Sequence, residues 1–296
     1  MTPIFFDKHQ SVPDVSSYSP SAGKPARFAE LMQHYDFRSY GQGFSAVVPV
    51  TREDLLLAHS PDYVSGVFDG TVLNGFDNQD PRVPTSCLWT IGSMLCAARW
   101  AMANPPLPAC APVSGFHHAC YAEGGGYCTF NGLMVVAAKL IAENPKCKVA
   151  ILDLDMHYGQ GTASILRQFP ALYKQIHHHS NGDHWYGNED PAEWFIWLQE
   201  CIDSINAFKP DLVLYQAGAD MHIKDPLGGL LNDSEMAQRD RSVFRKIRAP
   251  ICWNLAGGYR GSADLYTDAT LQTHRSTLME SNSSVAHRIE LLKETK

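Results

Sequence analysis

The 296-residue sequence contains no apolar run approaching the roughly 18 to 20 residues that a helix needs to cross a bilayer. Its first residues, Met1-Thr-Pro-Ile-Phe-Phe-Asp7, lack the basic segment and apolar core of a secretory signal peptide. Basic residues are also few, because 24 Lys and Arg stand against 31 Asp and Glu, for a net charge of −7. This acidic balance argues against a general binder of nucleic acid or anionic membranes. We therefore expect a cytoplasmic protein with neither kind of partner.

The eight cysteines form no C-x-x-C pair, which argues against a zinc knuckle or a dithiol redox centre. Reduced, mostly buried thiols are the expected state of such scattered cysteines. The sequence also has no internal repeat, no low-complexity tract and no linker-like segment. Because α/β folds reach this length undivided, residues 1–296 are predicted to form a single domain.

Hydrophobic residues make up 45% of the chain and gather in short runs separated by helical patterns. Runs typical of buried strands lie at residues 109–113, 149–152, 211–216 and 250–255, with a shorter one at 4–6. Helices are expected at residues 26–35, 91–102, 133–142, 161–168, 191–207, 234–248 and 264–279. Strands that alternate with helices favour an α/β fold, here a doubly wound parallel sheet with helices on both faces.

Two further segments are expected to be irregular. Residues 69–85 carry Gly, Asn, Asp and Pro without a period, which is typical of a long loop, and long loops in compact domains are often functional. The polar tail after Glu280 is expected to fray or to form a short helix. Acidic residues of the 69–85 loop could hold a substrate backbone or a distal amine, although the sequence does not indicate which of them does so.

Two carboxylates and an imidazole follow the strand at 149–152 at alternate positions, as Asp153, Asp155 and His157. Alternate residues of a strand share one face, so these side chains are expected to point into one crevice at the carboxyl end of the sheet. Mixed oxygen and nitrogen donors suit zinc, and also iron or manganese. On this stretch alone, a strand that ends in a polar loop with a helix-capping aspartate is about as good an explanation.

Polar residues also follow three other predicted strands, as the pair His117-His118, as Asp220 and as Tyr259. In a parallel sheet these ends share one edge, and four such ends make coincidence a poor explanation. Two aspartates and one histidine would leave zinc with an open position for water and substrate.

Five motifs, in order, resemble those of the zinc-dependent histone deacetylase superfamily, which also contains acetylpolyamine amidohydrolases and acetoin-utilisation proteins. They are Ser114-Gly-Phe-His117-His118, Gly125-Gly-Tyr-Cys-Thr-Phe-Asn131, Asp153-Leu-Asp155-Met-His157-Tyr-Gly159, Ala217-Gly-Ala-Asp220 and Gly257-Gly-Tyr259. The resemblance runs from about residue 4 to residue 275. It implies a single-domain arginase-like α/β fold and a zinc-dependent enzyme that removes an acyl group from an amine.

The same resemblance implies roles for the residues that match its motifs. Asp155, His157 and Asp220 would hold one zinc ion per chain, and Tyr259 would donate to the substrate carbonyl oxygen. This division of labour suits amide hydrolysis, which needs an activated water, a stabilised oxyanion and a protonated leaving amine.

His118 is expected to be the general base and acid, and His117 to be its electrostatic partner, oriented by Asp153. The sequence departs from many relatives at Gln160, where an acidic residue usually orients the second histidine. An amide supplies no negative charge, so His118 should be less basic here. Class IV deacetylases also carry a neutral amide at this place; a weakened enzyme is the alternative interpretation.

The resemblance assigns the substrate tunnel to Gly126, whose carbonyl would accept from the substrate amide, and to Tyr127 as an aromatic wall. Tyr186 is the preferred second wall, with Trp185 as the next choice. The segment 175–179, Gln-Ile-His-His-His, stands where relatives provide oxygens for a structural potassium ion. Because the sequence does not fix its register, a K+ site stays open, and hydrogen-bonded histidines at a strand end are expected rather than a surface metal chelator.

The substrate is expected to be a small acylated amine, such as an acetylated polyamine, or an acyl-lysine. An arginase-type binuclear manganese ureohydrolase would share the fold, but it needs more carboxylate ligands than these strand ends supply. A non-catalytic binding protein on the same fold is a third reading. The retention of Tyr259 and of both histidines argues against it. The sequence predicts neither the acyl length nor the oligomeric state.

Overall fold

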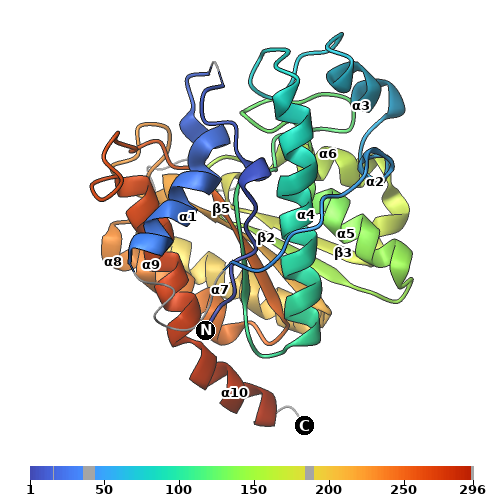
Figure 1. The fold of residues 1–296 in the computed structure, drawn as a ribbon. Coiled ribbons are helices and arrows are strands. Elements are labelled where there is room, and N and C mark those ends of the chain that lie inside the picture. Colours follow the sequence, from blue (N-terminus) through green and yellow to red (C-terminus); the bar gives the residue numbers. More distant parts are fainter. Residues whose placement is uncertain (16, 36–43, 184–189, 295–296) are drawn as a thin grey trace.

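A computed structural model describes residues 1–15, 17–35, 44–183 and 190–294 (Figure 1). Within these ranges five parallel strands form one sheet in the order β1-β5-β4-β2-β3. The strands are β1 (Ala109–Ser114), β2 (Val149–Asp153), β3 (Ile176–Ser180), β4 (Leu212–Gly218) and β5 (Ile251–Ala256). The predicted parallel α/β sheet is therefore confirmed, and each of the four longer apolar runs forms one of its strands.

Helices cover both faces of this sheet. The described α-helices are α1 (Lys24–His34), α2 (Arg52–Leu55), α3 (Pro61–Phe68), α4 (Arg82–Ala103), α5 (Gly132–Glu143), α6 (Gln160–Gln168), α7 (Pro191–Phe208), α8 (Asp233–Lys246), α9 (Ala269–Ser283) and α10 (Val285–Glu294). Strand side chains alternate between two buried clusters: Ile151 joins α4, α5 and α6, whereas Ala150 and Leu152 join α1, α7, α8 and α9. Figure 1 shows α1, α8 and α9 on one side of the sheet and α4, α5 and α6 on the other.

The helix expected from residue 91 begins earlier, at Arg82, so the predicted loop at 69–85 is wrong from residue 82 onward. The backbone N–H of Arg82 donates to Asp80 Oδ1 (2.9 Å), which starts the first turn. Pro84 lies in that first turn, where backbone N–H groups have no intrahelical acceptor, so the N–H that proline lacks costs the helix no hydrogen bond. The prolines of this segment thus mark the start of a helix rather than the body of a loop.

The run at residues 4–6 is not a strand of the sheet, contrary to the prediction. Ile4 and Phe5 form only isolated bridges, to Cys110 of β1 and to Ser45. A segment this short cannot sustain a ladder, although Ile4 is fully buried beside the sheet edge.

The last helices also differ from their predicted bounds. α9 begins at Ala269 rather than at residue 264, because the Asp268 side chain accepts from Leu271 N (3.0 Å) and caps the helix. The tail forms the ten-residue helix α10. All eight cysteines are free, as expected. In the part of the chain that the structure describes, no helix has the length and apolar character to cross a membrane.

Candidate metal centre and active site

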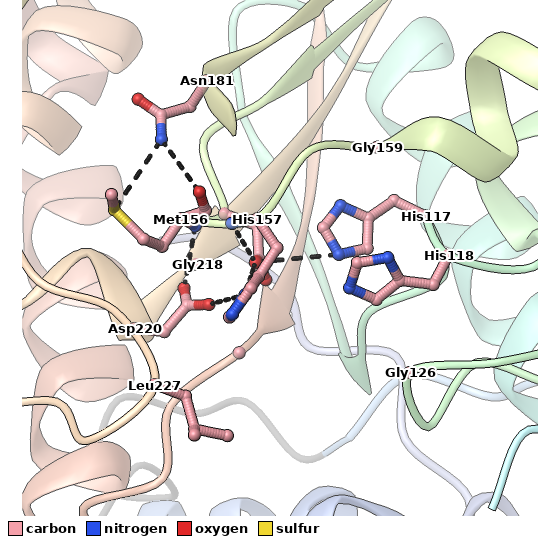
Figure 2. Close-up of polar contacts among 12 residues, drawn as sticks. His117, His118, Gly126, Met156, His157, Gly159, Asn181, Gly218, Asp220 and Leu227 are labelled. Carbon is pink, nitrogen blue, oxygen red and sulfur yellow. Dashed lines mark hydrogen bonds and ion pairs between the residues drawn. The ribbon is translucent and has the colours of Figure 1, made fainter. Parts of the chain in front are cut away.

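The ends of β2 and β4 bring three potential metal ligands together at the carboxyl edge of the sheet (Figure 2). His157 Nδ1 lies 3.1 Å from Asp155 Oδ1 and 2.9 Å from Asp220 Oδ2. One ligand atom from each residue lies within 4.8 Å of the others, and no other such group occurs among the described residues. The three residues that the sequence analysis selected as ligands therefore do lie together.

The electrostatics of this group suit a cation. Asp155 and Asp220 are buried, and burial together with the charge of Asp155 raises the pKa of Asp220 to about 7. Hydrogen bonds to the same two carboxylates raise the pKa of His157 to about 11. The cluster thus favours a positive charge between its carboxylates, which a divalent ion would supply while leaving His157 as a neutral ligand. Two carboxylates and one imidazole are a donor set that fits zinc.

The two ligand-bearing turns are joined through their backbone. The N–H of Met156, between two of the ligands, donates to Asp220 Oδ1 (3.2 Å). The carbonyl of Met156 accepts from Asn181 Nδ2 (3.4 Å), a contact that Figure 2 shows, and Asn181 in turn accepts from the indole N–H of Trp194. Because these partners lie at the ends of β2, β3 and β4 and on α7, the position of the turn that joins Asp155 to His157 depends on packing outside the candidate metal site.

The paired histidines follow β1 and point toward His157 and Asp220 from the other side of the site (Figure 2). His117 is buried, with Nδ1 2.7 Å from Asp153 Oδ2 and Nε2 3.7 Å from Asp155 Oδ1. Burial opposes a charge on this ring, but the carboxylates of Asp153 and Asp155 outweigh it and raise the pKa of His117 to about 9. A ring that is cationic at neutral pH suits the expected electrostatic role.

Gln216 is a buried residue of this arrangement that the sequence analysis did not select. It donates from Nε2 to Asp153 Oδ1 (2.9 Å) and accepts at Oε1 from the backbone N–H of Phe116 (3.0 Å), the residue before His117. One amide thus holds both the carboxylate and the backbone that position His117. Gln216 lies inside an apolar strand, and its polarity at a fully buried position was the available signal.

His118 differs from its neighbour because its partner is neutral. Its Nδ1 donates to Gln160 Oε1 (2.8 Å), and its ring lies 5.9 Å from that of His157. Burial and the nearby charge of His117 lower the pKa of His118 to about 4. One histidine of the pair is therefore held protonated and the other neutral, which is the arrangement that a base beside a cationic partner needs.

Tyr259 follows β5, and its backbone N–H donates to Asp225 Oδ2 (2.7 Å). Burial and the charges of Asp155 and Asp220 raise the pKa of its phenol well above the usual value, so the hydroxyl remains a donor. The preceding Gly257 has φ +45, and a Cβ there would come within 2.3 Å of Asp220 Cγ. The turn that carries Tyr259 can therefore approach the metal ligands only because this position is glycine.

Two of the predicted tunnel residues, Gly126 and Tyr127, lie beside this site. A Cβ on Gly126 would meet His118 Cδ2 at 2.3 Å, so that glycine packs directly on the imidazole. Tyr127 has the left-handed φ of +64, unusual for a residue with a side chain. Its ring centroid lies 6.1 Å from that of Tyr259 and 5.9 Å from that of Phe76. Phe76, in the 69–81 loop, is thus an aromatic neighbour of Tyr127 that the sequence analysis did not name. Tyr186 and Trp185 lie outside the described residues.

The histidine segment forms strand β3, and its register places Ser180 opposite Asp153. His177 and His179 share one face, with ring centroids 5.0 Å apart. The expectation of hydrogen-bonded histidines is wrong, since within the described chain one buried ring nitrogen of each has no partner. Burial lowers the pKa of His178 and of His179 to about 4, so both rings are neutral at physiological pH. A neutral ring gives up less hydration free energy on burial than a charged one. The potassium site stays a prediction.

Fold and site together define a parallel α/β protein with a cluster of three potential metal ligands, a histidine pair and a tyrosine at one sheet edge. The family model described as the histone deacetylase domain matches residues 22–193 and 184–273, which is most of the chain. The protein therefore belongs to the histone deacetylase family.

Similar proteins come from several sources. An uncharacterised protein of a Picosynechococcus species is 29% identical over 226 residues, covering 69% of this chain and 75% of that protein. Histone deacetylase 18 of Arabidopsis thaliana is 32% identical over 144 residues, which is 38% of this chain and 21% of that protein. The crystal structure of acetylpolyamine aminohydrolase from Burkholderia pseudomallei superposes with a TM-score of 0.73 at 17% identity, covering 96% of this chain and 99% of the other. That superposition confirms the predicted fold.

Proposed function

We propose that this protein is a zinc-dependent amidohydrolase that removes an acetyl or other acyl group from an acyl-lysine or from a small acylated amine such as a polyamine. The observation that carries the proposal is the convergence of Asp155, His157 and Asp220 opposite a histidine pair with unequal pKa values. The chemistry that zinc supplies when bound is polarisation of the acyl carbonyl and acidification of water. The zinc would be held by those three side chains, one ion per chain.

The remaining steps fall to residues of the chain. His118, neutral at physiological pH, takes a proton from the attacking water and returns it to the leaving nitrogen as the C–N bond breaks. His117 stays protonated beside Asp153 and stabilises the developing negative charge. The phenol of Tyr259 donates to the carbonyl oxygen as that oxygen gains charge. The products are the free amine and a carboxylic acid.

The binuclear ureohydrolase is the less favoured candidate. A second metal ion needs further carboxylates around the first, and the described residues contain only the one cluster of potential ligands. Metal analysis of the purified protein separates the two candidates, because one zinc per chain supports the amidohydrolase and two manganese ions support the ureohydrolase.

The test of the proposal is a turnover screen of the zinc-loaded protein over acetyl-lysine peptides, longer acyl-lysine peptides and N-acetylated polyamines. Asp155→Ala and His157→Ala should lose both bound zinc and turnover while the fold survives, and a hydroxamate should inhibit the parent by filling the open zinc positions. Asp62→Ala and His287→Ala, at exposed positions, are the matched controls and should behave as the parent. A zinc-loaded parent that hydrolyses none of these amides would refute the proposal.

A further inference from the structure

A single arginine donates to the backbone of both turns that carry metal ligands. Arg239, on α8, is fully buried. Its Nη1 donates to Gly218 O (2.6 Å) and, at a longer distance, to Leu154 O (3.4 Å). Leu154 directly precedes Asp155, and Gly218 lies two residues before Asp220. The guanidinium therefore bridges the ends of β2 and β4 behind the ligands.

The orientation of this guanidinium is fixed by its neighbour. Arg239 Nε donates to Asp240 Oδ1 (2.8 Å), and Asp240 also accepts from Tyr215 OH (2.5 Å) and Thr277 Oγ1 (2.6 Å). Asp240 is itself buried, and its partners lie on β4 and α9. A planar guanidinium held in this way presents its remaining donors in one direction, which a flexible ammonium cannot do.

The two turns leave little room for adjustment. A Cβ on Gly218 would lie 2.4 Å from Asp155 Cα and 2.7 Å from Asp220 Oδ1. The N–H of Met156 donates directly to the Asp220 carboxylate. A displacement of either backbone would therefore change the separation of the ligand oxygens, and metal sites need their ligands within about 0.5 Å of the productive geometry.

We propose that Arg239 is a positioning residue of the metal centre, which sets the spacing of Asp155 and Asp220 through their backbones. The inference rests on the proposed function in that this triad is taken to hold zinc. The simpler alternative is a core ion pair that stabilises the fold and nothing else, and the two differ in what zinc affinity does when the fold is kept. Residues outside the ligand set that orient ligands change metal affinity by about 10- to 100-fold when altered.

The experiment measures the zinc Kd of Arg239→Lys by competition with a chelator, together with the melting temperature of the metal-free protein. Lysine keeps a positive charge, but its single nitrogen on a flexible stem cannot hold Asp240 and both carbonyls in the fixed geometry of the guanidinium, so a zinc Kd weakened by about 10-fold or more is expected. Arg241→Lys is the matched control, because Arg241 lies on the same helix in a half-exposed pair with Glu280. Its zinc Kd should equal that of the parent. A folded Arg239→Lys variant that binds zinc as tightly as the parent would overturn the inference.

Asp240→Asn keeps the inference testable if Arg239→Lys does not fold. Asparagine retains an acceptor oxygen but removes the charge that orients the guanidinium, so a smaller loss of zinc affinity is expected. In that case an unchanged zinc Kd for Asp240→Asn would overturn the proposal. A parent protein that binds no zinc would overturn the proposed function and this inference together, whereas zinc binding that is indifferent to both variants would overturn the inference alone.

Discussion

The contact between His118 and Gln160 is where this chain departs from the carboxylate that many members of its family carry. The amide oxygen of Gln160 accepts a hydrogen bond from His118 Nδ1 (2.8 Å) and adds no charge. Burial and the charge of His117 lower the pKa of His118 to about 4. A base with so low a pKa is ready to accept a proton at every physiological pH, although it is a weaker base than one paired with a carboxylate. The neutral partner thus makes His118 a weaker base, but it keeps the ring in the neutral form that can accept a proton.

Gln160→Asp and the isosteric Gln160→Glu should both move the acidic limb of the kcat/KM profile to higher pH. A negative charge near His118 favours its protonated form and raises its pKa, by about one to three on the pH scale. Since the ring must be neutral to take a proton, activity on the acidic side falls first. The measurement is the limb position of the parent and of both variants over about pH 3 to 9, because a pKa of about 4 for His118 places the parent's limb near the acidic end of that range. Gln168→Asp, at an exposed position of the same helix, is the control. A limb that stays put or moves to lower pH in both variants would exclude His118 as the base.

Tyr259→Phe should lower kcat by about 100-fold or more and leave KM nearly unchanged, because its hydroxyl acts where charge develops on the carbonyl oxygen. Steady-state kinetics on the best substrate of the screen provide the measurement. Tyr266→Phe, which removes a hydroxyl from a largely exposed ring, should have no effect. An unchanged kcat for Tyr259→Phe would remove the phenol from the proposed mechanism.

Among single residues, the sequence could indicate polar residues that directly follow a predicted strand. Asp155, His157 and Asp220 were found in this way, because a parallel sheet brings such ends to one edge. Gln216 offered one signal, its polarity inside an apolar strand, but the sequence does not reveal that it contacts Asp153 and Phe116. Arg239 offered none, since its partners at the ends of β2 and β4 are backbone carbonyls that have no pattern in the sequence.

Among the helices, α10 shows how a polar tail can be structural. Arg288 is buried, and its guanidinium donates to four backbone carbonyls, those of Pro106, Phe244, Ile247 and Ala249. Phe244 and Ile247 belong to the C-terminal end of α8, where helix carbonyls lack intrahelical partners. Arg288 therefore supplies hydrogen-bond donors to carbonyls at the C-terminal end of α8.

Arg288→Met should destabilise the protein by about 3 kcal/mol, because several buried carbonyls lose a charged donor at once. The expected fall in melting temperature is roughly 5 °C or more for a chain of this size. Lys293→Met, at an exposed position of the same helix, should change it little. Equal melting temperatures for the two variants would show that α10 contributes nothing through Arg288. Zinc content should be the same in both.

The strands of the sheet were predictable because complete burial on both faces leaves continuous apolar runs. β3 was only partly predictable, since its three histidines hide the apolar character that a buried strand usually shows. Helix starts were less accurate than helix positions. The first N–H of α4 donates to Asp80, and Asp268 caps α9, whereas several aspartates nearby look equivalent in sequence. Local polarity does not reveal which aspartate accepts a hydrogen bond from a backbone N–H in the first turn of the helix.

On the scale of the whole molecule, the fold was predictable from the alternation of strands and helices, together with the order of the family motifs. The position of the site at one sheet edge follows from that topology. What the pattern could not reveal is how the site is held: partners from β1, β2, β4, α7 and α8 converge on two turns. The candidate metal site is therefore continuous with the core, so we expect metal binding there to raise the free energy of unfolding of the entire protein.

Removal of zinc should accordingly lower the stability of the whole fold. A ligand that binds only the native state stabilises it by about 4 kcal/mol when its free concentration is 1,000 times its Kd. Two buried carboxylates also lose the cation that offsets their burial and their repulsion, and it is burial first and the charge of Asp155 second that raise the pKa of Asp220 to about 7. Thermal unfolding with and without a chelator should therefore show a fall of several degrees for the parent protein. Asp155→Ala, which lacks a ligand and removes the repulsion between the two carboxylates, should melt at the same temperature under both conditions. If the parent melts identically with zinc and with chelator, the triad does not bind zinc in the native state.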